Sequence, residues 1–191
     1  MRIDCTGLRV SPQDAGELCR TENNGLLGRA ADWMRGGPQT IEILTSKQFY
    51  HPYYCVRLRM QLPRSRRVRT SAMEANMVVD GVFGTVQGME GIPQTEEKEV
   101  PAFQVAQTVC SRNQAADQVK EFIRKYLFRK YHAYPAFEPA KVTLVYKPLY
   151  AVYCQKRKKQ YYQIIDGEMG SKDYTLDIRY PKIRFCAEEP R

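Results

Sequence analysis

Residues 50–56 are Tyr-His-Pro-Tyr-Tyr-Cys-Val, and residues 146–152 are Tyr-Lys-Pro-Leu-Tyr-Ala-Val. After a basic segment, each copy continues into two β-branched residues and the motif Asp-Gly-x-x-Gly, at 78–84 and 164–170. The first copy holds ten more residues between its two elements than the second. Insertions of this kind are tolerated in surface loops and not inside paired strands. The pattern therefore predicts an internal duplication, with one long and one short hairpin connection.

The Asp-Gly pairs are expected to turn the chain. Glycine supplies the positive φ of a tight turn, and aspartate accepts hydrogen bonds from the turn backbone. Acid–base chemistry by paired carboxylates is the alternative for Asp80 and Asp166, because a pseudo-twofold axis can bring equivalent residues together. We favour the turn role, which is predicted for Asp80, Gly81, Gly84, Asp166, Gly167 and Gly170.

Hydrophobic periodicity predicts the elements around these motifs. Alternating apolar residues from Tyr54 to Leu62 predict a strand over 49–62, after a first strand over 40–44. An apolar stripe at three- and four-residue spacing predicts a helix that Ser111 caps and that ends near Tyr131. The remaining predictions are a helix beginning at Ser11, a helix over about 26–35, and strands at 77–79, 85–87, 142–153, 161–165, 174–178 and 183–186.

The order of these elements is similar in the two halves of the chain. It predicts an α+β protein of two similar helix-plus-antiparallel-sheet units, in which helices cover one face of each sheet. Residues 88–101 are acidic and contain two prolines, so they are expected to connect the halves. The predicted division is a first unit at 1–90, an acidic linker at 91–101 and a second unit at 102–191.

The charge balance of the 191-residue chain is basic, with a net charge of +9 and a pI near 9.3. Such a balance favours an acidic partner, whether nucleic acid, an acidic protein or a membrane surface. The sequence contains no apolar run long enough to span a bilayer and no secretory signal, so a cytoplasmic location is expected. Its six scattered cysteines, without a Cys-x-x-Cys pair, are expected to be reduced.

Residues suited to catalysis are sparse. Of the two histidines, His51 is expected on a strand surface and His132 at a helix end, where the helix dipole favours it. Cys55 lies four residues from His51, about 13 Å along a strand, which is too far for a thiol–imidazole pair. The chain has no nucleotide-binding, zinc-protease or hydrolase motif. We therefore predict no catalytic residue, no cofactor and no metal ligand.

The two basic connections are the most suggestive functional feature. Cations beside tyrosines can contact phosphates and stack on bases. Alternatively, charged hairpin tips keep strand edges soluble, and tyrosines suit strands by propensity. The candidate anion or nucleic-acid contacts are Arg64, Arg66, Arg67, Arg69, Lys156, Arg157, Lys158, Lys159 and Tyr161.

The carboxyl half of the chain resembles PepSY-type modules. The residues that carry the resemblance are Tyr-Tyr-Gln-Ile-Ile-Asp-Gly-Glu-Met-Gly at 161–170, with an echo at 78–84. PepSY-type modules are small cystatin-like α+β units in which a helix packs on a bent antiparallel sheet. The resemblance implies a non-catalytic role in binding or inhibition.

Three functions remain open at this point. The leading hypothesis is a non-enzymatic binding or scaffold module with an unknown acidic partner, which is expected to be a protein. Nucleic-acid binding through the two basic hairpins is the alternative. An enzyme is the third hypothesis, and it requires a pocket that gathers Cys55, His51 or both Asp-Gly carboxylates.

Overall fold

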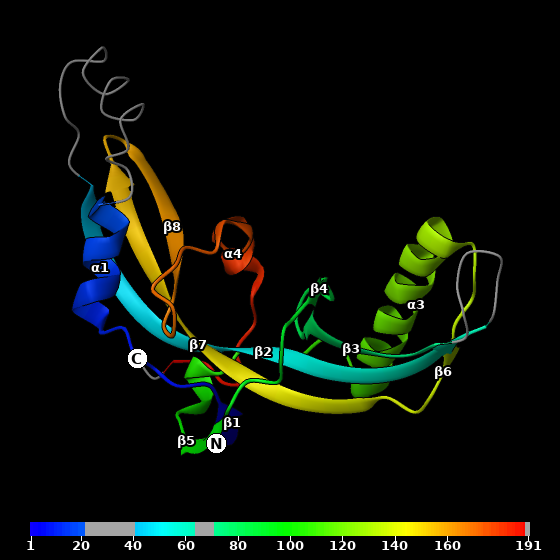
Figure 1. The fold of residues 1–191 in the computed structure, drawn as a ribbon. Coiled ribbons are helices and arrows are strands. Elements are labelled where there is room, and N and C mark those ends of the chain that lie inside the picture. Colours follow the sequence, from blue (N-terminus) through cyan, green and yellow to red (C-terminus); the bar gives the residue numbers. More distant parts are fainter. Residues whose placement is uncertain (22–40, 64–70, 190–191) are drawn as a thin grey trace, which may run out of the picture. The chain divides into compact units, whose positions relative to one another are not determined.

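The computed structural model describes residues 1–21, 41–63 and 71–189, which form a mixed α+β structure with more strand than helix (Figure 1). The chain divides into two compact units. Unit 1 contains Met1–His51, Glu96–Ala106 and Lys147–Arg191, and unit 2 contains Pro52–Thr95 and Gln107–Tyr146. Each unit therefore takes segments from both halves of the sequence, unlike the predicted division into 1–90 and 102–191.

Two long strands belong to both units. Strand β2 (Glu42–Leu62) passes from unit 1 into unit 2 after His51, and β7 (Lys141–Lys156) passes from unit 2 into unit 1 after Tyr146. The two strands are neighbours in the strand order. The segments predicted as separate strands at 40–44 and 49–62 thus form one strand from Glu42 onward. Both crossings fall inside the Tyr-x-Pro motifs.

Unit 2 is built on an antiparallel hairpin of β2 and β3. Strand β3 (Ser71–Asp80) pairs with β2 from Tyr53↔Asp80 to Leu62↔Ser71. Strand β4 (Val86–Gly88) pairs with β3, and the short β6 (Ala136–Phe137) pairs with β2. Helix α3 (Arg112–Tyr131) lies against this sheet (Figure 1).

The core of unit 2 follows the predicted periodicities. The alternating residues of β2 (Tyr54, Val56, Leu58, Met60 and Leu62) pack with the α3 stripe of Ala115, Val119, Ile123 and Leu127. Ser111 caps the helix through a capping box, in which it accepts from the Gln114 backbone and Gln114 accepts from the Ser111 backbone. The predicted helix and its cap are both confirmed.

The strands of unit 1 include one inside the predicted acidic linker. Strand β5 (Glu96–Glu99) pairs with β1 (Arg2–Cys5), and Arg2 lies 3.8 Å from Glu97 in an exposed ion pair. Strand β8 (Lys159–Asp166) pairs with β7 from Leu149↔Asp166 to Lys156↔Lys159. The segment expected only to connect the halves thus contributes a strand to unit 1.

Helices flank both faces of the β7–β8 hairpin, whereas the sequence predicted one covered face (Figure 1). Helix α1 (Pro12–Thr21) places Ala15 and Cys19 in a buried cluster with hairpin residues. The hairpin residues of this cluster are Tyr150, Val152, Cys154 and Ile165. Helix α4 (Tyr174–Arg179) packs on β8, and Tyr162 on that side contacts Tyr180.

Two predictions for the carboxyl-terminal segment are wrong. Residues 174–178 form α4 rather than a strand, because the Asp173 side chain accepts from the backbone N–H groups of Thr175 and Leu176 at 3.0 Å. Residues 183–186 form only a single bridge, Phe185↔Ala106, after the 3-10 helix η3 (Tyr180–Lys182). A second 3-10 helix, η2 (Ala102–Gln104), precedes Ala106. The helix predicted at 26–35 lies outside the described residues.

Candidate functional site

The Asp-Gly turn of unit 2 is held by a compact set of hydrogen bonds. Asp80 Oδ1 accepts from the backbone N–H groups of Val82 at 2.8 Å and Phe83 at 2.9 Å. The N–H of Gly81 donates to the Pro52 carbonyl at 2.9 Å. The carbonyl oxygen of Gly81 in turn accepts from the N–H groups of Val109 and Cys110, just before the capping residue of α3. The turn therefore ties the hairpin to the start of the helix.

The Asp-Gly turn of unit 1 repeats this arrangement. Asp166 Oδ1 accepts from Glu168 at 2.9 Å and Met169 at 3.2 Å, and Gly167 donates to the Pro148 carbonyl at 2.9 Å. The Gly167 carbonyl accepts from Arg9 and Val10, just before helix α1. Asp166 also pairs with Lys147, whose Nζ lies 2.5 Å from Oδ2. This carboxylate is occupied by structural contacts.

The residues considered for catalysis are buried or engaged. His51 is fully buried, so its expected place on a strand surface is wrong, and its ring packs edge-on against Phe49. His132 ends α3 in the left-handed conformation and packs against Phe128. Burial raises the pKa of the Cys55 thiol, which disfavours the nucleophilic thiolate. Within the described residues, no group of histidine, cysteine and carboxylate side chains has the arrangement of a metal site.

The structure describes one of the two basic connections. Arg64, Arg66, Arg67 and Arg69 lie outside the described residues. The other connection closes the β7–β8 hairpin, where Lys156 pairs with Lys159 and Arg157 adopts a positive φ of 58°. Arg157, Lys158 and Lys159 are exposed there. Four successive cations thus form the tip of a tight hairpin.

The tyrosines of this hairpin divide between its faces. Tyr161, a predicted nucleic-acid contact, is half-buried against the cluster beneath α1. On the opposite face, the ring of Tyr162 lies 4.7 Å from that of Tyr153 and 4.8 Å from that of Tyr180, between centroids. The Tyr153 hydroxyl donates to Gln160 Oε1 at 2.7 Å. These rings contact one another and belong to the packing of unit 1.

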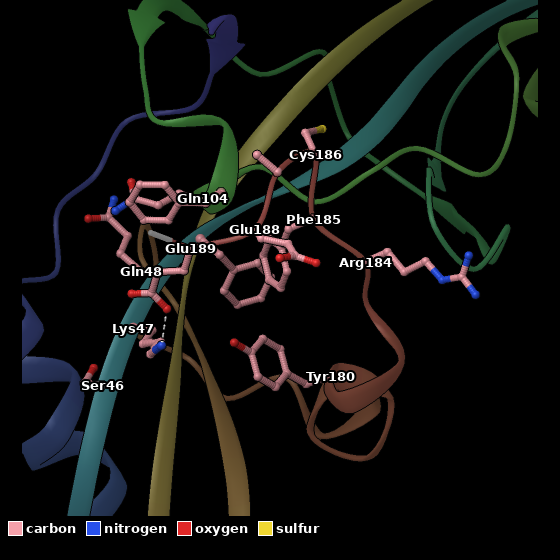
Figure 2. A pocket seen from close by; sticks show the side chains of 13 residues that line it. Ser46, Lys47, Gln48, Gln104, Tyr180, Arg184, Phe185, Cys186, Glu188 and Glu189 are labelled. Atoms are coloured by element: carbon pink, nitrogen blue, oxygen red, sulfur yellow. Dashed lines mark hydrogen bonds and ion pairs between the residues drawn. The ribbon is translucent and has the colours of Figure 1, made fainter. Parts of the chain in front are cut away.

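Tyr180 continues the aromatic row into a pocket of about 800 Å³ (Figure 2). Its ring lies 5.2 Å from that of Phe49, which lies 6.0 Å from that of Phe185. Lys47 and Glu189 form an ion pair at the pocket, and the thiol of Cys186 is exposed there. Burial, together with Tyr162 and Glu189, raises the pKa of Tyr180 to about 12. The pocket thus combines an aromatic wall with a polar rim.

A second hollow of about 500 Å³ lies between the hairpin and α4. It is lined on the hairpin side by Tyr153, Lys159, Gln160, Tyr161 and Tyr162, and on the other side by Asp177, Ile178 and Pro181. Ile178 is 82% exposed, although it is a large apolar residue. We call the surface formed by Tyr153, Gln160, Tyr162, Ile178, Tyr180 and Pro181, together with the 800 Å³ pocket, the aromatic face of unit 1.

Sequence reasoning identified the hairpin tip and missed most of the aromatic face. The sequence patterns put Tyr180 in a tail and Phe185 in a predicted strand, so nothing placed them beside Phe49 or Tyr162. The one local signal was Asp173, an N-cap residue type followed within a turn by Leu176. Asp173 thus indicates the start of helix α4, and this helix packs on β8 of the hairpin.

Comparison of the chain with family models, curated proteins and solved structures gives no match. None of the described helices is both long and apolar enough to cross a bilayer.

Proposed function

We propose that this protein is a non-catalytic binding module that engages a protein partner through the aromatic face of unit 1. The observation that carries the proposal is the row of rings from Tyr153 through Tyr162 and Tyr180 to Phe49 and Phe185, which lines two hollows of one unit. Aromatic side chains that present both apolar area and hydroxyl groups are enriched where proteins bind one another. The 82%-exposed Ile178 adds apolar surface beside them.

The occupied state of the polar candidates supports binding rather than catalysis. Asp166 is held by two backbone donors and Lys147, and burial raises the pKa of the Cys55 thiol. An enzyme needs a base or nucleophile that reaches its substrate with a suitable protonation state. The aromatic face instead offers shape, apolar area and hydrogen-bonding groups, which are the means by which an interface binds.

We also propose that the chain is an internal duplication whose repeats exchange helices. The first repeat runs from the α1 cap at Ser11 through β2 and β3 to Gly84, and the second runs from Ser111 through β7 and β8 to Gly170. The shared hydrogen bonds of the two Asp-Gly turns support this proposal. Helix α1 packs in unit 1 on the hairpin of the second repeat, and α3 packs in unit 2 on the hairpin of the first.

Peptide display tests the proposed binding function although the partner is unidentified. A random-peptide library is panned against the immobilised full chain, and recovered peptides are titrated against variants. Ile178→Asp should weaken binding about tenfold or more, because it places a charge in the apolar part of the face. Val109→Asp is the matched control, since Val109 is 72% exposed and belongs to unit 2.

Two results would overturn the binding proposal. The first is a library that yields no peptide binding above that of an unrelated basic protein. The second is a set of peptides whose affinity falls equally with Ile178→Asp and Val109→Asp, because such binding would not depend on the aromatic face.

Nucleic-acid binding remains the second candidate, on one specific observation. Residues 139–165 contain no aspartate or glutamate, and their cations include all four at the hairpin tip. A titration with single- and double-stranded oligonucleotides at several salt concentrations tests it, because phosphate contacts give a steep fall of affinity with salt. A flat response would remove this candidate.

A further inference from the structure

We infer that the free edge of β8 binds an acidic, extended segment of the partner protein as an added strand, with one apolar side chain in the hollow beside α4. The inference rests on the proposed binding function and goes further, because it specifies the charge, the backbone conformation and the docking line of the partner. Strand addition to an exposed sheet edge is a general mode of peptide recognition.

The backbone of Ile164 shows which residues of β8 face this edge. Its N–H donates to Asp177 Oδ1 at 2.6 Å, and its carbonyl accepts from the N–H of Asp173 at 2.9 Å. Both groups therefore point away from β7. Backbone groups two residues apart point the same way along a strand, so those of Gln160 and Tyr162 also point to this edge.

The edge is already extended by a partial third strand, which stops early. Lys172 bridges Ile165 in antiparallel fashion, and the Ser171 carbonyl accepts from Asp166 at 2.8 Å. At Asp173 the chain turns away into α4. Among the described strands, only β7 pairs with β8, so residues 159–163 offer a docking line of roughly 13 Å to an added strand.

The hollow of about 500 Å³ lies beside this docking line. Gln160 and Tyr162, whose backbone groups face the edge, also line the hollow, and Asp177, Ile178 and Pro181 line it from the far side. Because Asp177 already accepts from the Ile164 N–H, the side chain that enters the hollow is apolar and the acidic residues lie toward the hairpin tip. A peptide paired with Gln160 and Tyr162 directs alternate side chains to this face of the sheet. One of them can enter the hollow and cover the apolar surface of Ile178.

The charge of the hairpin argues for an acidic segment. Four successive cations, Lys156, Arg157, Lys158 and Lys159, lie at the hairpin tip, close to the docking line. Lys158 and Lys159 are exposed there. Cationic side chains of a bound segment would be repelled by this tip, whereas acidic side chains next to the paired residues would be attracted to it.

The same tip would attract phosphates, but the arrangement of its tyrosines favours a peptide. Binding of single-stranded nucleic acid relies on ring faces on which bases stack. The rings of Tyr153 and Tyr162 are packed together at 4.7 Å, and Tyr161 lies against the cluster beneath α1. What the edge offers is a row of backbone donors and acceptors, which a β-strand matches.

Synthetic probes test the inference on the full chain. The first probe is a fluorescent peptide in which valine and threonine alternate between flanking glutamates, and the second replaces the glutamates with lysines. Two further probes carry backbone N-methyl groups on one or the other alternate set of residues. Fluorescence anisotropy should show that the acidic probe binds at least tenfold more tightly than the lysine probe. Only one of the N-methylated probes should lose binding, because only one of the two alternate sets of N–H groups faces the edge of β8.

Variants and hydrogen exchange locate the bound probe. The double variant Lys158→Glu, Lys159→Glu should weaken the acidic probe at least tenfold and strengthen the lysine probe, whereas Lys141→Glu, in unit 2, should change neither. Hydrogen exchange at the amides of Gln160 and Tyr162 should slow when the acidic probe binds. Ile178→Asp should weaken the probe as it weakens peptides from display.

Several results would overturn the inference. Equal tolerance of both N-methylation patterns, equal binding of the acidic and lysine probes, or unchanged exchange at Gln160 and Tyr162 would each exclude an acidic added strand. An oligonucleotide that binds the hairpin tip while the acidic probe does not would assign the edge to nucleic acid. If display peptides still depend on Ile178 in these cases, the proposed binding function stands and only the strand inference fails.

Discussion

The backbone N–H of Gly167 donates to the carbonyl oxygen of Pro148 at 2.9 Å, and a side chain on Gly167 would collide with that acceptor. A Cβ at this position would lie 2.7 Å from the Pro148 oxygen, which is closer than real Cβ contacts. Gly81 and Pro52 are related in the same way, with 2.9 Å for the hydrogen bond and 3.0 Å for the added Cβ. The glycine of each Asp-Gly pair is therefore required for close approach to a strand.

Gly167→Ala should destabilise the protein by about 1–3 kcal/mol, because either the turn or β7 must move to admit the methyl group. Urea unfolding followed by circular dichroism measures the change. Gly7→Ala is the control, since nothing lies within 4 Å of a Cβ at Gly7, and it should stay within about 0.5 kcal/mol of the wild type. Equal free energies of unfolding for Gly167→Ala and Gly7→Ala would show that the Pro148 carbonyl does not exclude a side chain at position 167.

Lys147→Met should cost about 1–3 kcal/mol, because it leaves the Asp166 carboxylate, only 10% exposed, without its cation. The loss should be partly recovered in the double variant Lys147→Met, Asp166→Asn, in which no buried charge remains. Chemical unfolding of the four proteins gives the coupling energy. A coupling energy near zero would mean that the ion pair adds nothing to the turn.

The stability of unit 1 should fall with alkaline pH through Tyr180. The folded pKa of this phenol is about 12, and the ordinary value is 10.0. The folded state therefore binds more protons between these values, so the free energy of unfolding decreases as pH rises through this window. The free energy of unfolding should fall more steeply with pH in the wild type than in Tyr180→Phe, by at most about 1.4 kcal/mol per pH unit.

Unfolding curves at a series of alkaline pH values measure this slope. Tyr134→Phe, at a 65%-exposed position in unit 2, controls for the loss of one phenol from the chain. Parallel slopes for the wild type and Tyr180→Phe would contradict the raised pKa.

Cys186 should be the one thiol that a small aromatic disulfide reagent labels rapidly in the folded protein. It is exposed, whereas Cys5, Cys19, Cys55, Cys110 and Cys154 are buried. Partial burial raises the pKa of the Cys186 thiol, so its rate should be slower than that of a free thiol at neutral pH. Absorbance of the released product counts the fast-reacting thiols.

The control for this labelling is Cys186→Ser, which should abolish the fast phase and leave the five slow thiols to react on unfolding. A fast phase of two or more thiols would contradict the described burial. Because Cys186 lines the 800 Å³ pocket, a fluorophore attached there also reports whether a ligand enters the aromatic face.

Local features of the fold were predictable because their causes lie within a few residues. The two-residue alternation of Tyr54 to Leu62 places one face of β2 in the core, and Ser111 with Gln114 closes the capping box. Both outcomes follow from strand and helix geometry alone. The α+β class follows from the same signals.

Long-range features were not predictable for the opposite reason. The burial of Ala15 against Val152, and the proximity of Tyr180 to Phe49, depend on segments more than one hundred residues apart. His51 is an example. The sequence shows that it lies in a strand, but not which distant elements bury it, so it was wrongly predicted at the surface. The aromatic face combines 46–49, 103–104, 153–162 and 178–189, which no local pattern joins.

The interleaving of the two units sets an order for folding during synthesis. Unit 2 has all of its segments once Tyr146 leaves the ribosome, whereas unit 1 needs Met1–His51 together with residues after Lys147. Helix α1, with Ala15 and Cys19, therefore emerges first and waits for the hairpin that buries it. A nascent chain halted when Tyr146 has just left the ribosome should hold a formed α3 core beside an amino-terminal segment that still lacks its packing partners and is open to chaperones and proteases.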